Sequence, residues 1–190
     1  GGFNLGLTGN AVFGDATTDT VTGLGTLAVS GTTTINTATV TSAGTQTYNG
    51  AVTLGADTTL TTTDSTVLFS STVDSTGGAR DLTVSAGTGA ITFTGAVGGT
   101  AALDALALNS TGTTTLTAAV TAGSLATNAG GTTAINGGAV TTTGAQTYND
   151  NVTLGANTAL SATTTTFNGT VAGGGFNLGL TGNAVFGDAT

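Results

Sequence analysis

Short stretches in which apolar and polar residues alternate recur along the chain and predict β-strands of about three to six residues. In Ile91-Thr92-Phe93, for example, the two apolar side chains fall on one face of a strand and the threonine on the other. The alternating stretches lie at residues 52–54, 82–84, 90–94 and 106–108. Turn dipeptides separate the stretches, at Gly14-Asp15, Asn49-Gly50, Gly98-Gly99, Asn136-Gly137 and Asn168-Gly169.

The composition favours an all-β protein over a disordered one. Threonine fills 50 of the 190 positions, glycine 33 and alanine 29. Only 5% of the residues are charged and the mean hydropathy is +0.32, whereas disordered chains combine low hydrophobicity with high charge. Threonine suits a pleated, half-buried surface, while threonine and glycine are both poor helix formers. Residues 101–108 come nearest to a helical pattern, but the repeats described below predict a strand there.

A long repeat is visible in the sequence. Residues 1–17 (GGFNLGLTGNAVFGDAT) recur without a change as residues 174–190. We interpret residues 1–173 as one long tandem repeat, with a continuous fold, and residues 174–190 as the start of the next identical repeat. The expectation is a longer array of such units.

Smaller repeats lie inside the long one. Residues 44–60 match residues 144–160 at 12 of 17 positions. A shorter motif consists of one large apolar residue and a few small or turn residues, and about nine such motifs fill the long repeat. Its large residues are Phe13, Ile35, Tyr48, Phe69, Phe93, Leu116, Ile135, Tyr148, Phe167 and Phe186. A recurrence of roughly 20 residues has the scale of one solenoid turn or one hairpin.

Two architectures agree with this pattern, a parallel β-solenoid (β-helix) of short strands and a string of antiparallel β-sandwich domains. The short strands, the small corner residues and the recurrence of one motif favour the solenoid. A sandwich of about 100 residues usually has longer strands and a larger aromatic core. Nine turns at the strand spacing of about 4.8 Å rise about 43 Å. The two 13-residue steps, from Ile35 to Tyr48 and from Ile135 to Tyr148, predict that successive motifs there lie on different faces.

Three stretches resemble the β-strand repeats of large secreted bacterial surface proteins of the filamentous-haemagglutinin and adhesin type. They are GTGAITFTGAVGGTAAL (87–103), GTTAINGGAVTTTGAQTYN (131–149) and GAQTYNDNVTLGANTAL (144–160). The resemblance lies in composition and repeats and includes no catalytic or binding motif. It implies an exported, cysteine-free parallel β-solenoid at the bacterial cell surface, working as a stalk, fibre or adhesin.

The residue inventory excludes most enzyme chemistry. The chain has no Pro, Cys, Met, Trp, His, Lys or Glu, so it offers no imidazole base, thiolate, amine nucleophile or glutamate acid. We therefore expect no catalytic residues, no cofactor, no metal site and no enzyme activity. The net charge of −8 argues against nucleic acid as a partner, and no apolar stretch is long enough for a membrane span.

Few residues are candidates for binding. The nine aspartates lack the spacing of calcium-binding loops, although Asp15 and Asp19 could share an ion if their loop folds back. Tyr48 and Tyr148 are expected in the core with the hydroxyl reaching the surface, and Arg80 is expected to pair with Asp81. Thr-x-Thr pairs could form ranks on one flat face, and they lie at 32/34, 39/41, 59/61, 92/94, 113/115 and 163/165.

The sequence thus predicts a non-enzymatic structural repeat of an extracellular fibre or surface filament. Its main partner would be itself, through end-to-end stacking of neighbouring repeats at β-strand edges. The alternative is an adhesin or binding module whose Thr-rich face contacts a carbohydrate, ice, or a cell or environmental surface.

Overall fold

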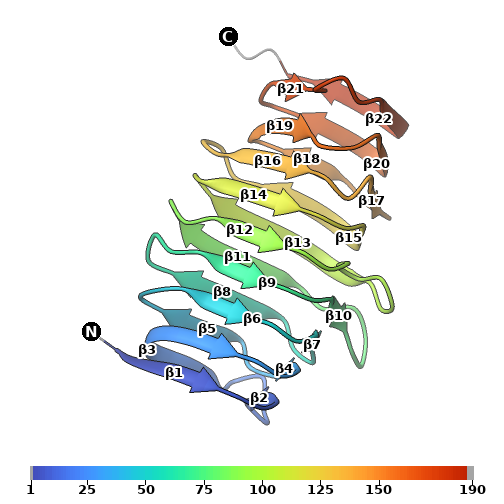
Figure 1. The fold of residues 1–190 in the computed structure, drawn as a ribbon. Helices are drawn as coiled ribbons and strands as arrows, with labels where there is room; N and C mark the ends of the chain where they lie inside the picture. Colours follow the sequence, from blue (N-terminus) through green and yellow to red (C-terminus); the bar gives the residue numbers. More distant parts are fainter. Residues whose placement is uncertain (1, 188–190) are drawn as a thin grey trace.

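Parallel strands stack on one another in about nine turns and make up a β-solenoid (Figure 1). The structure, a computed structural model, describes residues 2–187. Across these residues every strand pairing is parallel and no helix occurs. The prediction of a parallel β-solenoid is confirmed, and the antiparallel sandwich is excluded. Gly1 and residues 188–190, which include Asp188, lie outside the described residues.

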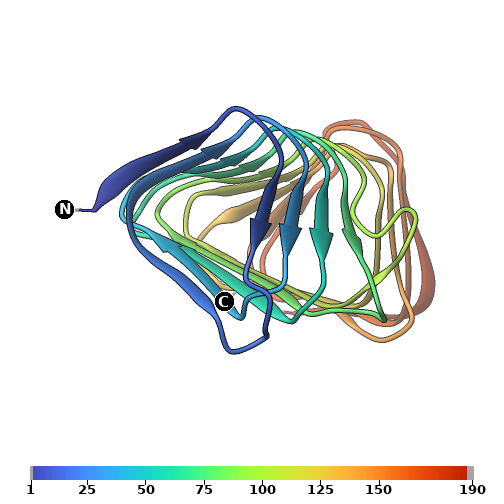
Figure 2. The same cartoon turned by 90° about the horizontal axis from the view of Figure 1, so that it is seen from below.

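Each turn passes through three strand positions, so the solenoid has three faces, which we number I, II and III in chain order. Figure 2, which looks along the stack, shows the turns superimposed around a common interior. Face I begins with the first strand and contains β1 (Phe3–Leu7), the second half of β3 (Thr20–Val29), β6 (Gln46–Tyr48), β9 (Val67–Phe69), β12 (Ile91–Phe93), β14 (Thr113–Leu116), β16 (Thr132–Ile135), β19 (Asn151–Leu154) and β21 (Val171–Ala172).

Faces II and III share three long strands that bend around the corner between them. Face II contains β2 (Ala11–Phe13), β4 (Thr33–Ile35), β7 (Val52–Leu54), β10 (Val73–Ser75), a bridge at Val97, the first half of β15 (Val120–Thr127), β17 (Ala139–Thr142), and the first halves of β20 (Thr158–Phe167) and β22 (Leu178–Phe186). Face III contains the start of β3, β5 (Thr39–Ser42), β8 (Thr58–Thr62), β11 (Leu82–Gly87), β13 (Leu103–Ser110), β18 (Gln146–Tyr148), and the second halves of β15, β20 and β22.

The core is a set of columns of inward side chains, because every second residue of each strand points into the solenoid. On face I the register places one column through all the middle turns: Val29, Tyr48, Phe69, Phe93, Leu116, Ile135 and Leu154. These side chains are buried, while the alternate residues are half-buried or exposed. The alternating stretches read from the sequence are therefore strands, including residues 103–108 of the stretch nearest to a helical pattern.

Two aromatic stacks run inside the solenoid on different faces. On face I the rings of Tyr48, Phe69 and Phe93 stack with centroid distances of 5.2 and 4.6 Å and nearly parallel planes. On face III the rings of Tyr148 and Phe167 are 5.3 Å apart, and Phe186 continues the stack at 5.1 Å. The internal repeat of the sequence thus starts each stack with a tyrosine and places the two copies on different faces.

The turns are unequal in length, and the extra residues form one protruding corner. Two pairs on face I show the difference. Thr114 pairs with Thr133 across a short turn, and Val67 pairs with Ile91 across a longer one. One long loop, residues 14–19, lies between β2 and β3 in the first turn. Further additional residues lie in the loops 76–81 and 98–102, which extend outward in Figure 1 beyond β10 and before β13. Both loops occupy the corner between faces II and III. We call these two loops the protruding corner.

Candidate functional site

Threonines line the outer faces of the solenoid, but within residues 2–187 their regular ranks extend over four turns at most. Face II carries one such file, Thr121, Thr141, Ser161 and Thr181. On face III, Thr20, Thr39, Thr59 and Thr83 stand side by side on adjacent strands. The parallel file Thr41, Thr61 and Ser85 lies next to it. In the following turn Ala107 and Asn109 occupy these two positions, so the double file ends after three turns.

The six Thr-x-Thr pairs predicted as candidates are spread over all three faces. Only 39/41 and 59/61 lie in one file on face III. Thr115 projects outward on face I beside Thr92, and Thr34 projects outward on face II. Thr165 is buried, because Phe167 sets the inward phase of that strand. A flat face of regular threonine ranks through the whole solenoid is therefore not formed by residues 2–187.

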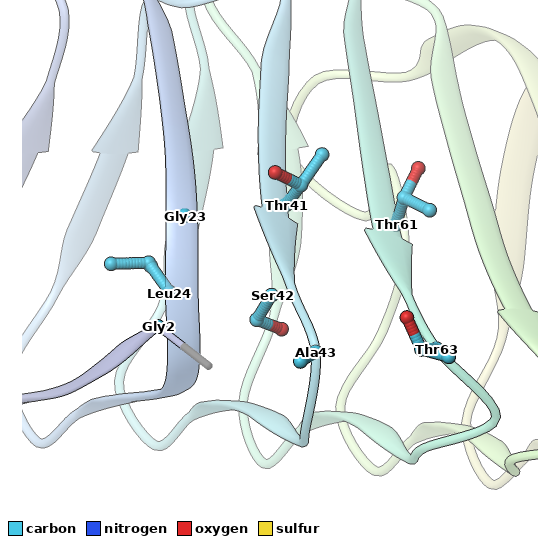
Figure 3. Close-up of a pocket in the computed structure, with 8 residues that line it drawn as sticks. All are labelled: Gly2, Gly23, Leu24, Thr41, Ser42, Ala43, Thr61 and Thr63. Atoms are coloured by element: carbon cyan, nitrogen blue, oxygen red, sulfur yellow. The ribbon is translucent and has the colours of Figure 1, made fainter.

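The larger of the two depressions that we describe borders the short threonine rank. It has a volume of about 290 Å³ and lies at the corner between faces III and I. Figure 3 shows Thr41 and Thr61 projecting from neighbouring strands, with Ser42 and Thr63 below them. Its remaining lining residues are Gly2, Gly23, Leu24 and Ala43. The lining has hydroxyl groups and small apolar surfaces, but neither an ionisable group nor an aromatic ring that would hold a sugar.

The second depression, of about 240 Å³, lies beneath the protruding corner. Its lining consists of Ala79, Ala102, Leu103, Asp104, Thr121, Ala122, Gly123, Thr141 and Thr143. Asp104 is the one carboxylate in this lining, so the depression holds no pair of acid and base groups.

The two tyrosines are buried together with a glutamine each. The Tyr48 hydroxyl donates to Gln46 Oε1 at 3.0 Å, and Gln46 Nε2 donates to the carbonyl oxygens of Val40 and Thr61. Burial raises the pKa of the Tyr48 hydroxyl far above its usual value. The core position was predicted correctly, but the expectation that the hydroxyl reaches the surface is wrong, because Gln46 satisfies it inside.

The second copy of the motif repeats this network on another face. The Tyr148 hydroxyl donates to Gln146 Oε1 at 3.1 Å, and Gln146 Nε2 donates to the carbonyl oxygens of Val140 and Ser161. Burial again raises the pKa of the tyrosine. Both networks are structural, since neither tyrosine hydroxyl is accessible to a ligand.

Three inward threonines keep their hydroxyls without a hydrogen-bond partner, at Thr33, Thr114 and Thr165. Thr114 stands in a column with Ile91 before it and Thr133 after it. An unpaired buried hydroxyl costs about 1–3 kcal/mol, and all three residues are closed off from solvent. They are therefore a cost of using threonine in a narrow core, and they form no binding site.

Aspartates at the corners connect one turn to the next. The carboxylate of Asp57 accepts a hydrogen bond from the backbone N–H of Asp81, and the carboxylate of Asp81 accepts one from Ala105. Asp64 and Asp74 accept backbone N–H groups of the following turn in the same way. No motif in the sequence indicates this hydrogen bonding between turns.

The other charged candidates also bind backbone groups. Asp19 accepts hydrogen bonds from the N–H groups of Asp15 and Ala16, which lower the pKa of its carboxyl. The loop therefore does fold back, but onto its own amides. No group of three potential metal ligands occurs in the part of the chain that the structure describes. The guanidinium of Arg80 reaches the carbonyl oxygens of Thr76 and Gly77 and not the predicted partner Asp81.

Asp150 is the one buried acid among residues 2–187. Its carboxylate accepts hydrogen bonds from the Gly131 N–H at 2.8 Å and from the Thr133 hydroxyl at 3.1 Å. Burial nevertheless raises the pKa of its carboxyl, and the hydrogen bonds oppose this shift only in part. The folded state therefore binds the proton more tightly than the unfolded state does, so this residue's contribution to stability decreases as the pH rises from about 4.

We expect Asp150→Asn to gain stability relative to the wild type as the pH rises. The amide keeps an oxygen for the Gly131 N–H and cannot ionise, so the cost of burying a charge disappears at neutral pH. Urea midpoints of both proteins, measured at pH 3.5 and pH 7, check this. An unchanged difference between the two proteins at both pH values would contradict it.

The two ends of the solenoid expose strand edges. Within the described residues, β1 pairs only with β3, and β22 only with β20. Large apolar side chains are exposed there: 64% of Phe3 and 61% of Phe186 are accessible. A parallel strand with one free side leaves N–H and C=O groups unpaired, and such an edge pairs readily with another strand.

Comparison with known proteins finds no matching protein-family model, no matching curated protein and no matching solved structure. The residues described by the structure include no helix that could cross a membrane. The chain is therefore placed by its fold, as a parallel β-solenoid with Thr-rich outer faces, a closed core and two open ends.

Proposed function

We propose that this chain is a non-enzymatic structural repeat of an extracellular fibre or surface filament, and that neighbouring repeats stack end to end through β-strand edges. The observation that carries the proposal is the pair of open ends on a solenoid whose last turn repeats the sequence of its first. In a tandem array the second repeat begins at residue 174, and its next strands cover the exposed edge at β22.

The outer surface also supports a structural role. The two depressions contain neither an aromatic platform nor a pair of ionisable groups, and the buried tyrosine and glutamine pairs serve the core. One arginine and no lysine leave a single cleavage site per repeat for trypsin-like proteases. Resistance to proteolysis agrees with the extracellular setting that the resemblance to bacterial surface fibres implies.

The alternative, an adhesin or binding module that uses a threonine face, has less support. Its longest files of hydroxyl residues extend over four turns, one on face III (Thr20, Thr39, Thr59 and Thr83) and one on face II (Thr121, Thr141, Ser161 and Thr181). A binding face for a repeating surface needs ranks of one residue type over many turns, so we do not propose it for this segment.

The experiment is a comparison of assembly by the 190-residue chain and by two variants of its last turn. The Thr158 N–H of β20 donates to the Asn177 carbonyl oxygen, and Thr158 is paired with Leu178 of β22. In a parallel pair, successive residues of a strand direct their N–H and C=O groups to opposite sides, so Asn177 and Gly179 face β20 while Leu178 and Leu180 face away from it. The Leu180 N–H therefore points to the free edge. Leu180→Pro removes this N–H, whereas Leu180→Ala removes apolar surface but keeps it.

We expect the wild type and Leu180→Ala to form straight filaments. Leu180→Pro should need a protein concentration at least about tenfold higher to assemble, because a loss of about 1.4 kcal/mol in the free energy of association corresponds to a factor of ten. Sedimentation and electron microscopy measure this. A stable wild-type monomer at high concentration, or equal assembly of the two variants, would overturn edge stacking.

A further inference from the structure

We propose that the free edge of the last turn receives the remainder of the second long repeat, which begins at residue 174, and that this repeat is seated one face further round the solenoid than the first. Successive repeats of the fibre are then rotated by a third of a turn. This inference rests on the proposed fibre and deepens it, because it names the partner segment and its register.

The first step is that the two identical segments lie on different faces. The segment 5–13 occupies faces I and II, whereas its copy 178–186 occupies faces II and III. The pairings that show this are Leu5 with Leu27 and Phe13 with Ile35 in the first copy, and Leu178 with Thr158 and Phe186 with Phe167 in the second. Every position has moved forward by one face.

The second step is the length of the repeat in turns. Seven of the nine motif steps join residues on the same face and advance by a full turn. The two 13-residue steps advance by two thirds of a turn: Ile35 on face II precedes Tyr48 on face I, and Ile135 on face I precedes Tyr148 on face III. The repeat therefore spans eight and one third turns.

A change of face is tolerated where two faces offer the same environment to one motif, as faces I and III do. The hydrogen-bond network of Gln46 and Tyr48 on face I recurs at Gln146 and Tyr148 on face III, with O···O distances of 3.0 and 3.1 Å. Each face demands only an inward apolar column and small corner residues. One sequence unit can thus fold on more than one face.

The third step is the state of the terminal edge. Phe13 and Phe186 are the same residue of the repeat, but Phe13 is 7% exposed and Phe186 is 61% exposed. The strands that follow Phe13 in the first copy, the second half of β3 and β4, pair with β1 and β2. The edge at β22 presents the same inward residues and lacks these two strands. The remainder of the second repeat supplies them, on faces II and III.

The consequence concerns what the fibre displays. Each repeat has one protruding corner, which carries Arg80, the chain's single positive charge. Rotation by a third of a turn places this corner successively on the three corners of the solenoid. The protruding corners of successive repeats are then about 40 Å apart along the axis, at about 4.8 Å per turn, and the pattern returns after about 120 Å.

The experiment uses a chain of six consecutive repeats, each with Ala79→Cys in the exposed loop of the protruding corner. The protein contains no other cysteine, so a maleimide gold label marks each repeat once. Electron microscopy is expected to show labels at steps of about 40 Å in three rows around the fibre. Labels at this spacing in a single row would overturn the rotation and leave the structural fibre intact, whereas irregular spacing would overturn the fibre and the rotation.

A second measurement tests the rotation without any assembly. In the 190-residue chain, Thr166 is the paired neighbour of Val185 on face III, whereas Ser161 lies on face II beside Thr181. We expect the double variant Thr166→Cys with Val185→Cys to form a disulfide on mild oxidation, and Ser161→Cys with Val185→Cys not to form one. The positive control is Val12→Cys with Thr34→Cys, which joins the same residue of the repeat in the first copy to its paired neighbour in the following turn on face II. The reverse result would place both copies on face II and overturn the inference.

Discussion

Replacing Phe69 with alanine is expected to lower the free energy of unfolding by about 3–5 kcal/mol. The side chain is fully buried and stacks on both sides, at 5.2 Å from Tyr48 and 4.6 Å from Phe93. The narrow interior has no other side chain to fill the space between two turns, so the cavity interrupts the stack. Urea unfolding followed by far-ultraviolet circular dichroism, in the Leu180→Pro background to limit association, measures the loss.

The control for Phe69→Ala is Leu68→Ala in the same strand. Leu68 points outward beside Thr47 and Thr92, so its truncation leaves no internal cavity. We expect a loss below about 1 kcal/mol. If both variants lose the same stability, the alternation of inward and outward positions on face I is wrong.

The periodic part of the fold could be predicted from the sequence because it depends on local rules. Strand positions follow from alternation, and the corners follow from small turn residues. At Gly50, which follows Asn49, a Cβ would overlap the carbonyl oxygen of Gly31 in the turn below. A glycine is required there by the close approach of stacked turns, and the Asn-Gly pair in the sequence indicates the corner correctly.

The phase of alternation in threonine-rich stretches could not be predicted, because threonine fits either side of a strand. In residues 163–166 four threonines follow one another, and the side of each is set from outside the run, by Phe167 and by the register of Thr165 with Gln146. The same ambiguity hid the unpaired hydroxyls of the core. It also made a continuous threonine face look available, although its members are divided among three faces.

Contacts between turns were equally hidden, since they join residues that are a whole turn apart in the sequence and share no motif. The carboxylate of Asp74 accepts the N–H groups of Thr100 and Ala101, residues of a loop one turn later. Nothing near Asp74 in the sequence indicates these donors. The fractional advance at the 13-residue steps was visible in the spacing, but its value needed the strand register.

Replacing Gln46 with leucine is expected to cost about 2–4 kcal/mol, since buried polar groups left without partners cost about 1–3 kcal/mol each. The variant leaves the Tyr48 hydroxyl without its acceptor and removes the donor to the carbonyl oxygens of Val40 and Thr61. Adding Tyr48→Phe to Gln46→Leu removes the unpaired tyrosine hydroxyl and should recover about 1 kcal/mol of the free energy of unfolding. Urea midpoints of the two variants and of Tyr48→Phe alone complete the double-mutant cycle.

The matched test is Gln146→Leu in the second copy of the network. Gln146 Nε2 donates to the carbonyl oxygens of Val140 and Ser161, each at 3.0 Å, and its Oε1 accepts from Tyr148. The two networks have the same hydrogen-bond geometry and are equally buried, although they lie on faces I and III. The losses of unfolding free energy caused by the two substitutions should therefore differ by less than about 0.5 kcal/mol. A much larger difference would mean that the faces are not equivalent environments, and the equivalence of faces is the condition under which one repeat can follow another after a third of a turn.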